Sequence, residues 1–482
     1  MSSWVSKMYP LWALLTMNYL DMSGGQNSKT APFFIKDNEC ELVQNYNMDN
    51  LGSLTKRDGI ANVIGQTVDA KSITGMYFFQ DKLGTDYSNA LISVSTTIKK
   101  IKAADDTWED SDTGLTSGTE VYFSTFVDYV FRTDGISAME SSADLSTWGT
   151  TNCLATLKPK YNCVWEDRLY ALNDNSTTSY PSRIYWSELP TGTPLALTFG
   201  ANNWADINPD DNDEITWGEP FGKTLLIFKK NGLYRWTFGQ TEPDKLIDIG
   251  TPQGRTVKQT QGICFWANKD GVYAFDGSSY PVPISAEVKD FIEQISDLSA
   301  MRAEVDEDHY NLYIGDVTVN GISYANVMLV YTISRASWHI ETYPFEIKSM
   351  ARFASDTIGT TVLYDSIYLG DDDGFVYRKG TGTSDYLGTV AKTINGKIVS
   401  KEYPLSKFPQ ESILNKLYVF CISGIGAKVN YCIERGEWKP WKDLKSRITE
   451  GNIVGKGRTI QLSITDNSTK TSQVEGFSIE EK

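Results

Sequence analysis

Short hairpin units recur along this chain, and they constrain its fold more than any other feature of the sequence. One unit is residues 262–277, GICFWANKDGVYAFDG, where an apolar strand, a turn ending in Asp-Gly and a second strand follow one another. Asn-Gly and Asp-Gly supply the positive φ angles that tight hairpins require. Comparable units occupy residues 128–141, 163–176, 224–239 and 365–380. Because one hairpin cannot bury its own hydrophobic faces, several units have to stack against one another.

The spacing of these units predicts an all-β fold. They recur every ~30–45 residues, the range expected for the blades of a β-propeller. About seven units fit between Ile73 and Gly380, and the largest, at residues 301–344, has three successive strand patterns. One helix is expected at residues 285–304, where apolar residues have helical spacing and Ser285 precedes them as a cap. We therefore predict an about seven-bladed β-propeller, which closes the sheets and hides their edges.

Three parts of the chain follow from these patterns. Residues 1–64 form an extended polar arm, residues 65–385 the propeller, and residues 386–482 a C-terminal antiparallel β-sandwich. The apolar stretch at residues 7–20 has a lone basic residue and is too short to span a membrane. It is interpreted either as a signal peptide or as the product of a start codon placed too early, with the functional chain beginning near Met17 or Met22.

Composition argues against several classes of partner and site. The 482 residues carry a formal net charge of −16, which disfavours binding of nucleic acid in a basic groove and docking on an anionic membrane. The six cysteines form no C-x-x-C pair, and they indicate reduced, buried thiols in a protein assembled in the cytoplasm. The two histidines, His309 and His339, are far apart in sequence, so neither a zinc site nor a His-based catalytic triad is expected.

Acidic clusters are the main candidates for chemistry. A glycosidase needs two carboxylates at a fixed separation, and clusters occur at residues 104–112, 206–214 and 370–374. All three lie between strand patterns, so solvated loops are expected. Oxygen-bearing residues in the second cluster alternate like calcium ligands: Asn208, Asp210, Asn212 and Glu214. The glycine and the distal glutamate of an EF-hand loop are missing there.

Two further patterns have both a structural and a functional interpretation. The turn at residues 141–151 resembles the Asp-box of sialidases, with Ser142, Asp144 and Trp148 in matching places, and such boxes stabilise the fold away from catalysis. Three tryptophans either bind sugars or fill the space between blades, and packing is favoured: Trp204, Trp217 and Trp236. No Walker loop, Rossmann glycine pattern, G-x-S-x-G or H-E-x-x-H motif is present. We predict no catalytic residue, no metal site and no cofactor.

The arm segment SGGQNSKTAPFFIKDNECELVQNYNMDNLGSLTKRDGIANV, residues 23–63, resembles the opening of tail hub (nozzle) proteins and related tail structural proteins of short-tailed bacteriophages. In those proteins a Gly-Gly-x-Asn start leads through an Asn-rich strand to a Gly-Ser/Ala-Leu-x-x-Arg-x-Gly turn. The matching positions are Gly24, Gly25, Asn27, Asn45, Asp49, Gly52, Leu54, Arg57 and Gly59. Residues 217–239, 271–293 and 457–462 continue the likeness in the same order. It spans nearly the whole chain as a succession of loose motifs.

The resemblance implies a non-enzymatic structural protein of the virion. Such subunits stand six around a ring below the portal and adaptor, near tail fibre or tip proteins, and form the channel through which double-stranded DNA is ejected. The protein would then be a homohexamer of the viral tail, assembled in the host cytoplasm without membrane insertion. The arm positions from Gly24 to Gly59 would bind a neighbouring subunit or the adaptor, since extended polar segments gain order from partners. Three basic residues expected at a hairpin tip are interpreted as solvated charges rather than a brake on DNA: Lys229, Lys230 and Arg235.

Two alternatives from other classes stay open. A secreted carbohydrate-active propeller, either a sialidase-like hydrolase or a capsule depolymerase, would need acidic residues that converge in a deep axial pocket. An adhesin would bind glycans without cleaving them. Turnover of sialyl or polysaccharide substrates, and glycan binding by the monomer, distinguish these alternatives from a tail protein.

Overall fold

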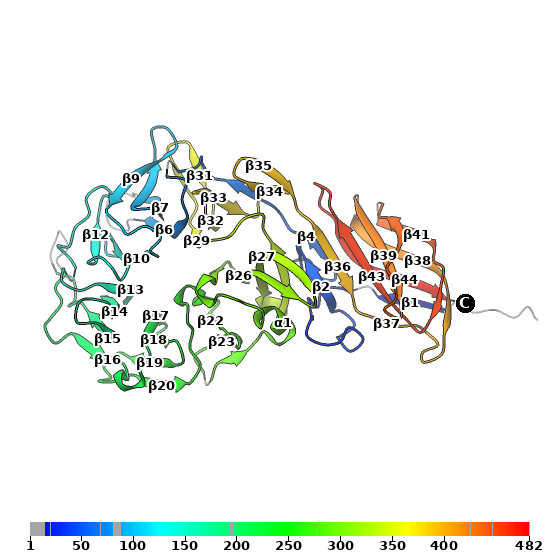
Figure 1. Cartoon of the computed structure of the whole chain (residues 1–482), viewed down its shortest axis with the longest axis horizontal. Helices are drawn as coiled ribbons and strands as arrows, with labels where there is room; N and C mark the ends of the chain where they lie inside the picture. The colour runs from blue at the N-terminus through cyan, green and yellow to red at the C-terminus, as the bar shows by residue number, and fades with distance from the viewer. Residues whose placement is uncertain are drawn as a thin grey trace, which may run out of the picture. The chain divides into compact units, whose positions relative to one another are not determined.

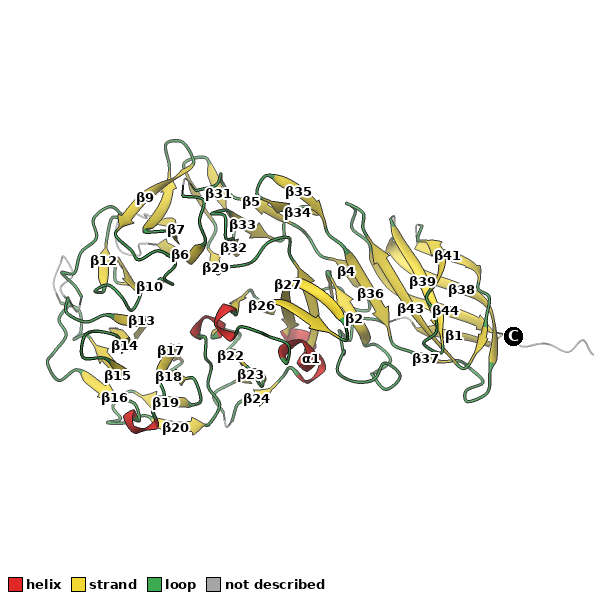
Figure 2. Ribbon diagram, in the orientation of Figure 1, coloured by secondary structure: helices red, strands yellow, loops and turns green. Residues whose placement is uncertain are grey.

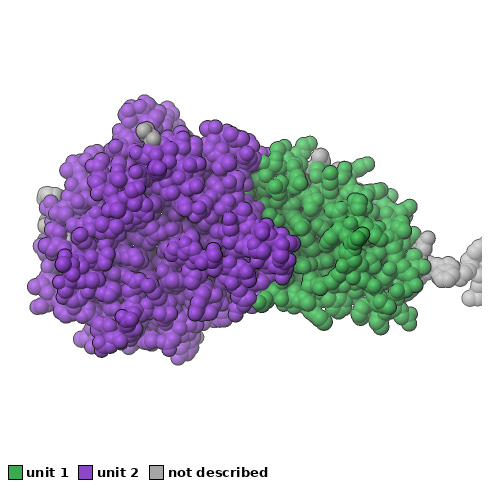
Figure 3. Space-filling model, viewed as in Figure 1, with its two compact units in different colours: residues 1–57, 337–340, 393–482 green, residues 58–336, 341–392 purple. Residues whose placement is uncertain are grey.

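The computed structural model describes residues 15–19, 21–67, 69–80, 88–153, 155–191, 197–278, 280–424, 426–445 and 447–481. The chain forms two compact units (Figure 3). Unit 1 comprises residues 1–57, 337–340 and 393–482, and unit 2 comprises residues 58–336 and 341–392. The expected division into arm, propeller and sandwich therefore differs from the structure, because the arm and the C-terminal module belong to one unit.

Unit 2 consists of small antiparallel sheets arranged around a ring, as Figures 1 and 2 show. Five of them follow in chain order. The first sheet contains β6 (Ile73–Gln80), β7 (Ser88–Val94), β8 (Thr97–Lys102) and β9 (Thr107–Thr113), and the second contains β10 (Tyr122–Phe126), β11 (Tyr129–Thr133) and β12 (Glu140–Ser142). The third contains β13 (Pro159–Trp165), β14 (Arg168–Asp174), β15 (Tyr180–Trp186) and β16 (Trp204–Asp206), the fourth contains β17 (Ile215–Phe221), β18 (Thr224–Lys229), β19 (Leu233–Thr237) and β20 (Asp244–Ile247), and the fifth contains β21 (Lys258–Thr260), β22 (Ile263–Asn268), β23 (Gly271–Phe275) and β24 (Val282–Pro283). This arrangement is a β-propeller, as the recurring hairpins predict.

A sixth sheet closes the ring with a strand from the start of unit 2. Its order is β29 (Ser349–Phe353), β32 (Ser366–Gly370), β33 (Val376–Lys379) and β5 (Ile60–Asn62). β5 pairs antiparallel with β33, with Ile60 opposite Lys379 and Asn62 opposite Tyr377. The first and last blade segments of the sequence are thus held together by backbone hydrogen bonds.

The expected count of about seven blades is wrong, because one unit does not form a blade of its own. Strands β25 (Arg302–Val305), β26 (His309–Val319), β27 (Ile322–Thr332) and β28 (Ser337–Thr342) are neighbours in this order, but among the described residues they do not form a separate sheet. Among the described residues, unit 2 therefore has six blades with sheets of their own, and β25 contacts β21 and β29 beside them.

Two hairpins and a few short helices complete unit 2. The hairpins are β30 (Asp356–Ile358) with β31 (Thr361–Leu363), and β34 (Ser384–Leu387) with β35 (Val390–Thr393). The helices are η1 (Pro209–Asp211), η2 (Gly254–Thr256), η3 (Ala286–Val288), α1 (Lys289–Ile292), η4 (Leu298–Ala300) and η5 (Ile333–Arg335).

The long helix expected at residues 285–304 is broken into single turns. The hydroxyl of Ser285 makes no helix cap and instead accepts a hydrogen bond of 2.9 Å from the Val272 amide. The carboxylate of Asp297 accepts from the Ser299 amide and so starts a separate turn, η4. The apolar stripe is nevertheless buried, as Phe291 shows at 1% exposure. These local hydrogen bonds therefore determine the structure of the segment more than the helical spacing of its apolar residues does.

Apolar cores lie between neighbouring sheets of unit 2 rather than inside single sheets. One core joins side chains of β22 and β23 to those of β18 and β19, including Trp266 and Phe228, whose rings lie 5.3 Å apart. Another joins the closing sheet to the first blade through Phe353, Tyr368 and Ile73. Each blade thus depends on its neighbours for burial, which is the reason why the ring must close.

Unit 1 contains strands from both ends of the chain. One set is ordered β3 (Tyr46–Asn47), β4 (Leu54–Lys56), β44 (Gln473–Glu481), β38 (Ser412–Ser423) and β41 (Arg447–Asn452), with β1 (Leu15–Tyr19) on β44 and β42 (Lys456–Gly457) on β38. The other is ordered β2 (Cys40–Gln44), β36 (Gly396–Ser400), β43 (Thr459–Asp466), β39 (Ala427–Ile433) and β40 (Lys439–Asp443), with β37 (Tyr403–Pro404) on β43. Apart from β1, the N-terminal stretch at residues 7–20 lies outside the described residues.

The arm is part of the hydrophobic core of unit 1. Tyr46 and Leu54 are fully buried in one cluster with Leu417, Ile464 and Phe477 of the C-terminal strands. β2 also pairs antiparallel with β36. The expected irregular arm is therefore mostly ordered, because its apolar positions complete a core that the C-terminal strands cannot close alone.

Ring closure can be tested at Ile60, which is fully buried. We expect Ile60→Ala to lower the free energy of unfolding by about 2–5 kcal/mol, because it empties core volume on the closing strand. Chemical denaturation followed by tryptophan fluorescence measures this change. Val362→Ala, at a side chain that is 49% exposed, is the control, with an expected change within about 0.5 kcal/mol. Equal effects of the two substitutions would contradict the proposed role of β5.

Candidate functional site

The first strands of the sheets surround the axis of unit 2. Successive first strands contact one another, as β6 with β10, β10 with β13, and β13 with β17 do. Side chains on the inner side of these strands therefore meet near the axis although they are far apart in the sequence. Two cavities lie there, and Arg302 on β25 lines both of them.

Glu120, just before β10, is the centre of a charged cluster on this axis. Its carboxylate accepts a hydrogen bond of 2.5 Å from Nη2 of Arg302 and one of 2.5 Å from the hydroxyl of Tyr122. The Nε atom of Arg255 lies 3.9 Å from the second oxygen. Glu120 and Arg302 are 182 residues apart, so only the closed ring brings them together.

Both arginines also bind backbone carbonyls of other segments. Arg302 donates to the carbonyls of Lys348 at 2.9 Å and Ser299 at 2.6 Å. Arg255 donates to the carbonyls of Thr74 on β6 at 2.5 Å and Val121 at 3.2 Å. The two side chains thus connect elements that are distant in sequence, and they act as cross-links of the ring.

The position of Arg255 depends on a close backbone approach. Arg255 lies in η2, and the Gln253 side chain accepts a hydrogen bond from its amide. A Cβ atom on the neighbouring Gly254 would lie 2.2 Å from the carbonyl oxygen of Thr216. Glycine is therefore required for η2 to lie against β17.

The charges of the cluster stabilise one another. Burial raises the pKa of Glu120, but Arg255, Arg302 and the Tyr122 hydroxyl outweigh this effect and hold the pKa below its usual value. Burial lowers the pKa of Arg302, which Glu120 partly offsets. For Arg255, Glu120 and Tyr122 outweigh burial and raise the pKa. Glu120 is therefore a charged carboxylate in the folded protein.

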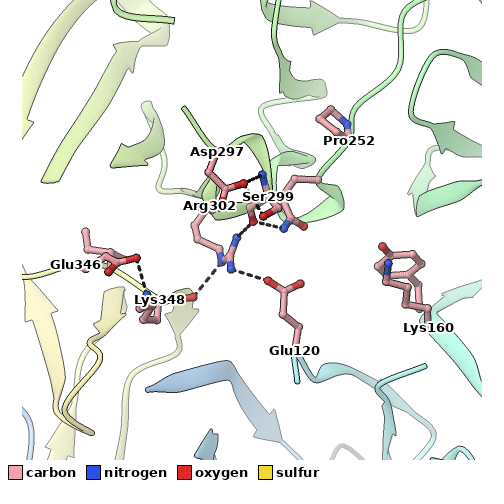
Figure 4. Close-up of a pocket in the computed structure, with 12 residues that line it drawn as sticks. Glu120, Lys160, Pro252, Asp297, Ser299, Arg302, Glu346 and Lys348 are labelled. Atoms are coloured by element: carbon pink, nitrogen blue, oxygen red, sulfur yellow. Dashed lines mark hydrogen bonds and ion pairs between the residues drawn. The ribbon is translucent and has the colours of Figure 1, made fainter. Parts of the chain in front are cut away.

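The larger axial cavity, of the two that Arg302 lines, has a volume of about 360 Å³ and a polar lining (Figure 4). Figure 4 shows the Arg302 guanidinium between Glu120 and the carbonyls of Ser299 and Lys348. The other acidic groups of the lining are also engaged. Glu346 pairs with Lys348 at 2.5 Å, and Asp297 accepts from the amide and hydroxyl of Ser299. This arrangement favours a structural role for these carboxylates over acid–base chemistry.

The carboxylate of Glu219 on β17 has a different environment. It accepts a hydrogen bond of 2.9 Å from the Trp217 indole. Burial raises its pKa to about 7, with a further upward contribution from Glu304 and opposing ones from Trp217 and Lys258. Lys258 on β21 is itself paired with Glu304 at 2.9 Å. Glu219 therefore titrates near neutral pH.

The positions of the arm that carry the family resemblance are used within the chain. The Gly24 amide donates to the Asn38 carbonyl, and Asn27 donates to the carboxylate of Glu39. Arg57, only 5% exposed, donates from Nε to the side-chain oxygen of Asn45 at 2.9 Å. Their binding to another protein stays a prediction.

The remaining arm positions do not form one surface either. Leu54 is fully buried in the core of unit 1, and Asp49 is exposed. The Gly52 amide donates to the Ser23 hydroxyl. Gly59 belongs to unit 2, and its amide donates to the Gly382 carbonyl. The nine positions thus serve several local purposes, and the structure does not bring them together as a single site.

The acidic loop at residues 206–214 is cross-linked by basic residues. Asp211 pairs with Lys229 at 2.7 Å, and Glu214 pairs with Lys230 at 2.7 Å. The expectation that Lys229 lies on a solvated hairpin tip is wrong, because its side chain is fully buried at the end of β18. Within the described residues, no group of three or more His, Cys, Asp or Glu side chains has the arrangement of a metal site.

The tryptophans singled out in the sequence have different environments. Trp236 is 7% exposed and belongs to a core between blades. Trp204 is 41% exposed and stacks on the guanidinium of Arg183, which also pairs with Asp206. Trp217 lines the smaller axial cavity, the other one that Arg302 lines. Packing explains Trp236, and Trp204 is the exposed aromatic side chain of the three.

The turn that resembles an Asp-box is built on its aspartate. The carboxylate of Asp144 accepts from the amides of Ser146 and Thr147, each at 2.8 Å, and from the Ser142 hydroxyl. Trp148 donates from its indole to Ser111 at 3.1 Å. These contacts stabilise the turn.

Sequence comparison identifies no family for the chain: no family model and no curated protein matches it. Solved structures with some likeness include YCF48 from Cyanidioschyzon merolae, with 10% identity over 67% of this chain and 98% of that one, at a TM-score of 0.42. BamB from Moraxella catarrhalis has 10% identity over 67% and 96% of the two chains, at 0.41. The designed Ika8 protein has 11% identity over 66% and 99%, at 0.39. Likeness at this level carries no argument about function.

The axial cross-links predict a large effect of removing one charge. We expect Glu120→Gln to lower the free energy of unfolding by on the order of 3 kcal/mol, because Arg302 and Arg255 then lack their shared carboxylate. Calorimetry at pH 7 measures the change. Glu346→Gln is the matched control, because Glu346 is 45% exposed and such a pair is worth about 1 kcal/mol or less. A smaller effect at Glu120 than at Glu346 would refute the cross-link.

Glu219 predicts a defined pH dependence. Between about pH 4.5 and about pH 7 the folded chain keeps a proton on Glu219 that the unfolded chain releases, so its contribution to stability falls as pH rises through this window. We expect Glu219→Gln, which resembles the protonated form, to gain on the order of 2 kcal/mol relative to wild type between pH 5 and pH 8. Glu242→Gln, at an exposed carboxylate, should show no such trend in parallel urea titrations.

Proposed function

We propose that the protein is a non-enzymatic structural subunit of a short-tailed phage tail, located in the virion. In this proposal several copies form a ring below the portal and adaptor, and double-stranded DNA passes through the ring during genome ejection. The proposal starts from the sequence resemblance of residues 23–63 and of the later motifs. The structural observation that carries it is the engagement of Glu120 in cross-links at the axis, as expected of a rigid building block.

Exposed apolar side chains of unit 1 support assembly into a ring. On the seven-stranded sheet, Ile422 of β38 is 57% exposed and Ile448 of β41 is 56% exposed. Phe420, opposite Ile448 in the strand register, is partly exposed between them. Contiguous apolar groups on a sheet face mark contact surfaces in soluble proteins. We assign the contact between subunits to this face.

Charge is compatible with passage of DNA. Six copies would carry six times the formal charge of −16, so a channel wall of this protein has the same sign as DNA and offers few attractive contacts. At physiological salt such repulsion extends only about 8 Å from the wall. It would therefore prevent sticking without blocking transport. Within the described residues, no helix has the length and apolar character needed to cross a membrane.

Assembly can be tested by the mass of the purified protein, alone and with its adaptor. We expect wild type to form a ring, which sedimentation velocity detects. The double substitution Ile422→Lys and Ile448→Lys should give monomers, because it places charges in the apolar contact. Ile322→Lys, at a side chain of unit 2 that is 49% exposed, is the matched control and should still assemble. A wild-type monomer in the presence of the adaptor, or rings formed by the double variant, would contradict the proposal.

The carbohydrate-binding alternative has one favourable observation, the exposed Trp204 ring backed by Arg183. Aromatic faces of this kind bind sugars as well as other apolar surfaces. Glycan binding that Trp204→Ala abolishes would favour an adhesin, and turnover of a polysaccharide by the monomer would favour a hydrolase. Either result would replace the structural proposal.

A further inference from the structure

The smaller axial cavity of unit 2 has an unusual lining. Its volume is about 170 Å³, and three cationic side chains line it, those of Arg255, Lys258 and Arg302. Its remaining walls include the aromatic rings of Tyr122 and Trp217. None of the described residues that line it is acidic. The carboxylates that pair with these cations, Glu120 and Glu304, are not among the residues that line it.

Arg255 keeps donor capacity toward this cavity. The carbonyls of Thr74 and Val121 both accept from its Nη2 atom. Glu120 is the carboxylate nearest to it, and the 3.9 Å from Nε exceeds hydrogen-bond distance. A guanidinium has five N–H donors. The Nη1 side of Arg255 is thus not neutralised by a direct bond to any carboxylate of the described residues.

Lys258 and Arg302 add two more donors with one carboxylate partner each. Lys258 donates to Glu304 at 2.9 Å, and an ammonium group has two further N–H donors. Arg302 donates to Glu120 through Nη2, and that atom has a second N–H. Direct ion pairs thus join these three cations to two carboxylates, Glu120 and Glu304.

We infer that this cavity is a binding site for a small oxyanion of the phosphate type. A tetrahedral anion accepts hydrogen bonds from several directions, as these donors on η2, β21 and β25 require. Arginine and lysine are the side chains best suited to such contacts. The aromatic walls exclude water and so strengthen the electrostatic attraction. The volume equals that of about six liquid waters at about 30 Å³ each, which admits one such ion but excludes a nucleotide or an oligosaccharide.

The inference is independent of the proposed function. It concerns one chain, and it needs neither the ring assembly nor a phage origin. The formal charge of −16 on the whole chain repels anions, so binding must come from these three side chains at short range. Charges farther than about 8 Å from the ion are screened at physiological salt. We expect a dissociation constant in the millimolar range for these three donors.

Thermal unfolding of the full chain in phosphate tests the inference. We expect 20 mM sodium phosphate at pH 7 to raise the Tm by about 2 °C over sodium chloride of equal ionic strength, through preferential binding to the folded state. The double substitution Lys258→Met and Glu304→Gln removes the ammonium group together with its partner, so no buried charge is left unpaired. The phosphate effect should disappear in this variant. Lys245→Met, which removes an exposed lysine of β20, is the matched control and should keep it.

A second measurement on wild type covers the case in which the double variant does not fold. A crystal soaked in selenate should show an anomalous peak between Arg255 and Lys258. General salt stabilisation would raise the Tm of wild type and of both variants equally. That result, no difference between phosphate and chloride, or a cavity without a selenate peak would each overturn the inference.

Discussion

The antiparallel pairing of β5 with β33 is the interaction on which unit 2 depends. It joins residues 60–62 to residues 377–379, so the ring is held at its seam by backbone hydrogen bonds rather than by a covalent link. Gly59 fixes the approach, because a Cβ atom there would lie 1.9 Å from the Ser384 carbonyl oxygen. The apolar cores lie between sheets, and an open ring would expose one face of each terminal sheet to water. Closure is therefore a condition for burial in every blade.

Charged side chains at the axis add specificity to this closed ring. Arg255 reaches carbonyls of the first two blades, and Arg302 reaches the loop before the last one. A buried ion pair contributes little net stability compared with apolar packing, but a missing partner is severely penalised. The cluster therefore favours the one arrangement in which all its members meet. In this view the cores between blades provide the stability of unit 2, while Glu120 and the arginines define which segments lie opposite each other.

Much of the fold could be predicted from the sequence, and the failures have identifiable physical causes. Hairpins such as residues 262–277 have local signals, namely alternation and Asp-Gly turns, so the propeller was predictable. The helix at residues 285–304 failed because Ser285 bonds to Val272 instead of capping it. The axial cluster was missed entirely, since Glu120 and Arg302 have no local pattern and meet only through ring closure. The blade count was wrong because strands β25 to β28 do not form a separate sheet, which no local pattern reveals.

The arm positions that carry the family resemblance also have roles within the chain. Its glycines and asparagines match the tail-protein pattern, yet the structure gives them intramolecular reasons to be there. Gly25 has a φ of +89°, and a Cβ atom on it would lie 2.9 Å from the Trp338 carbonyl oxygen. Arg57 is bound by Asn45 inside unit 1. Because hydrogen bonds within the chain do not exclude contacts with a partner, the binding of these positions to a neighbouring subunit or to the adaptor stays a prediction.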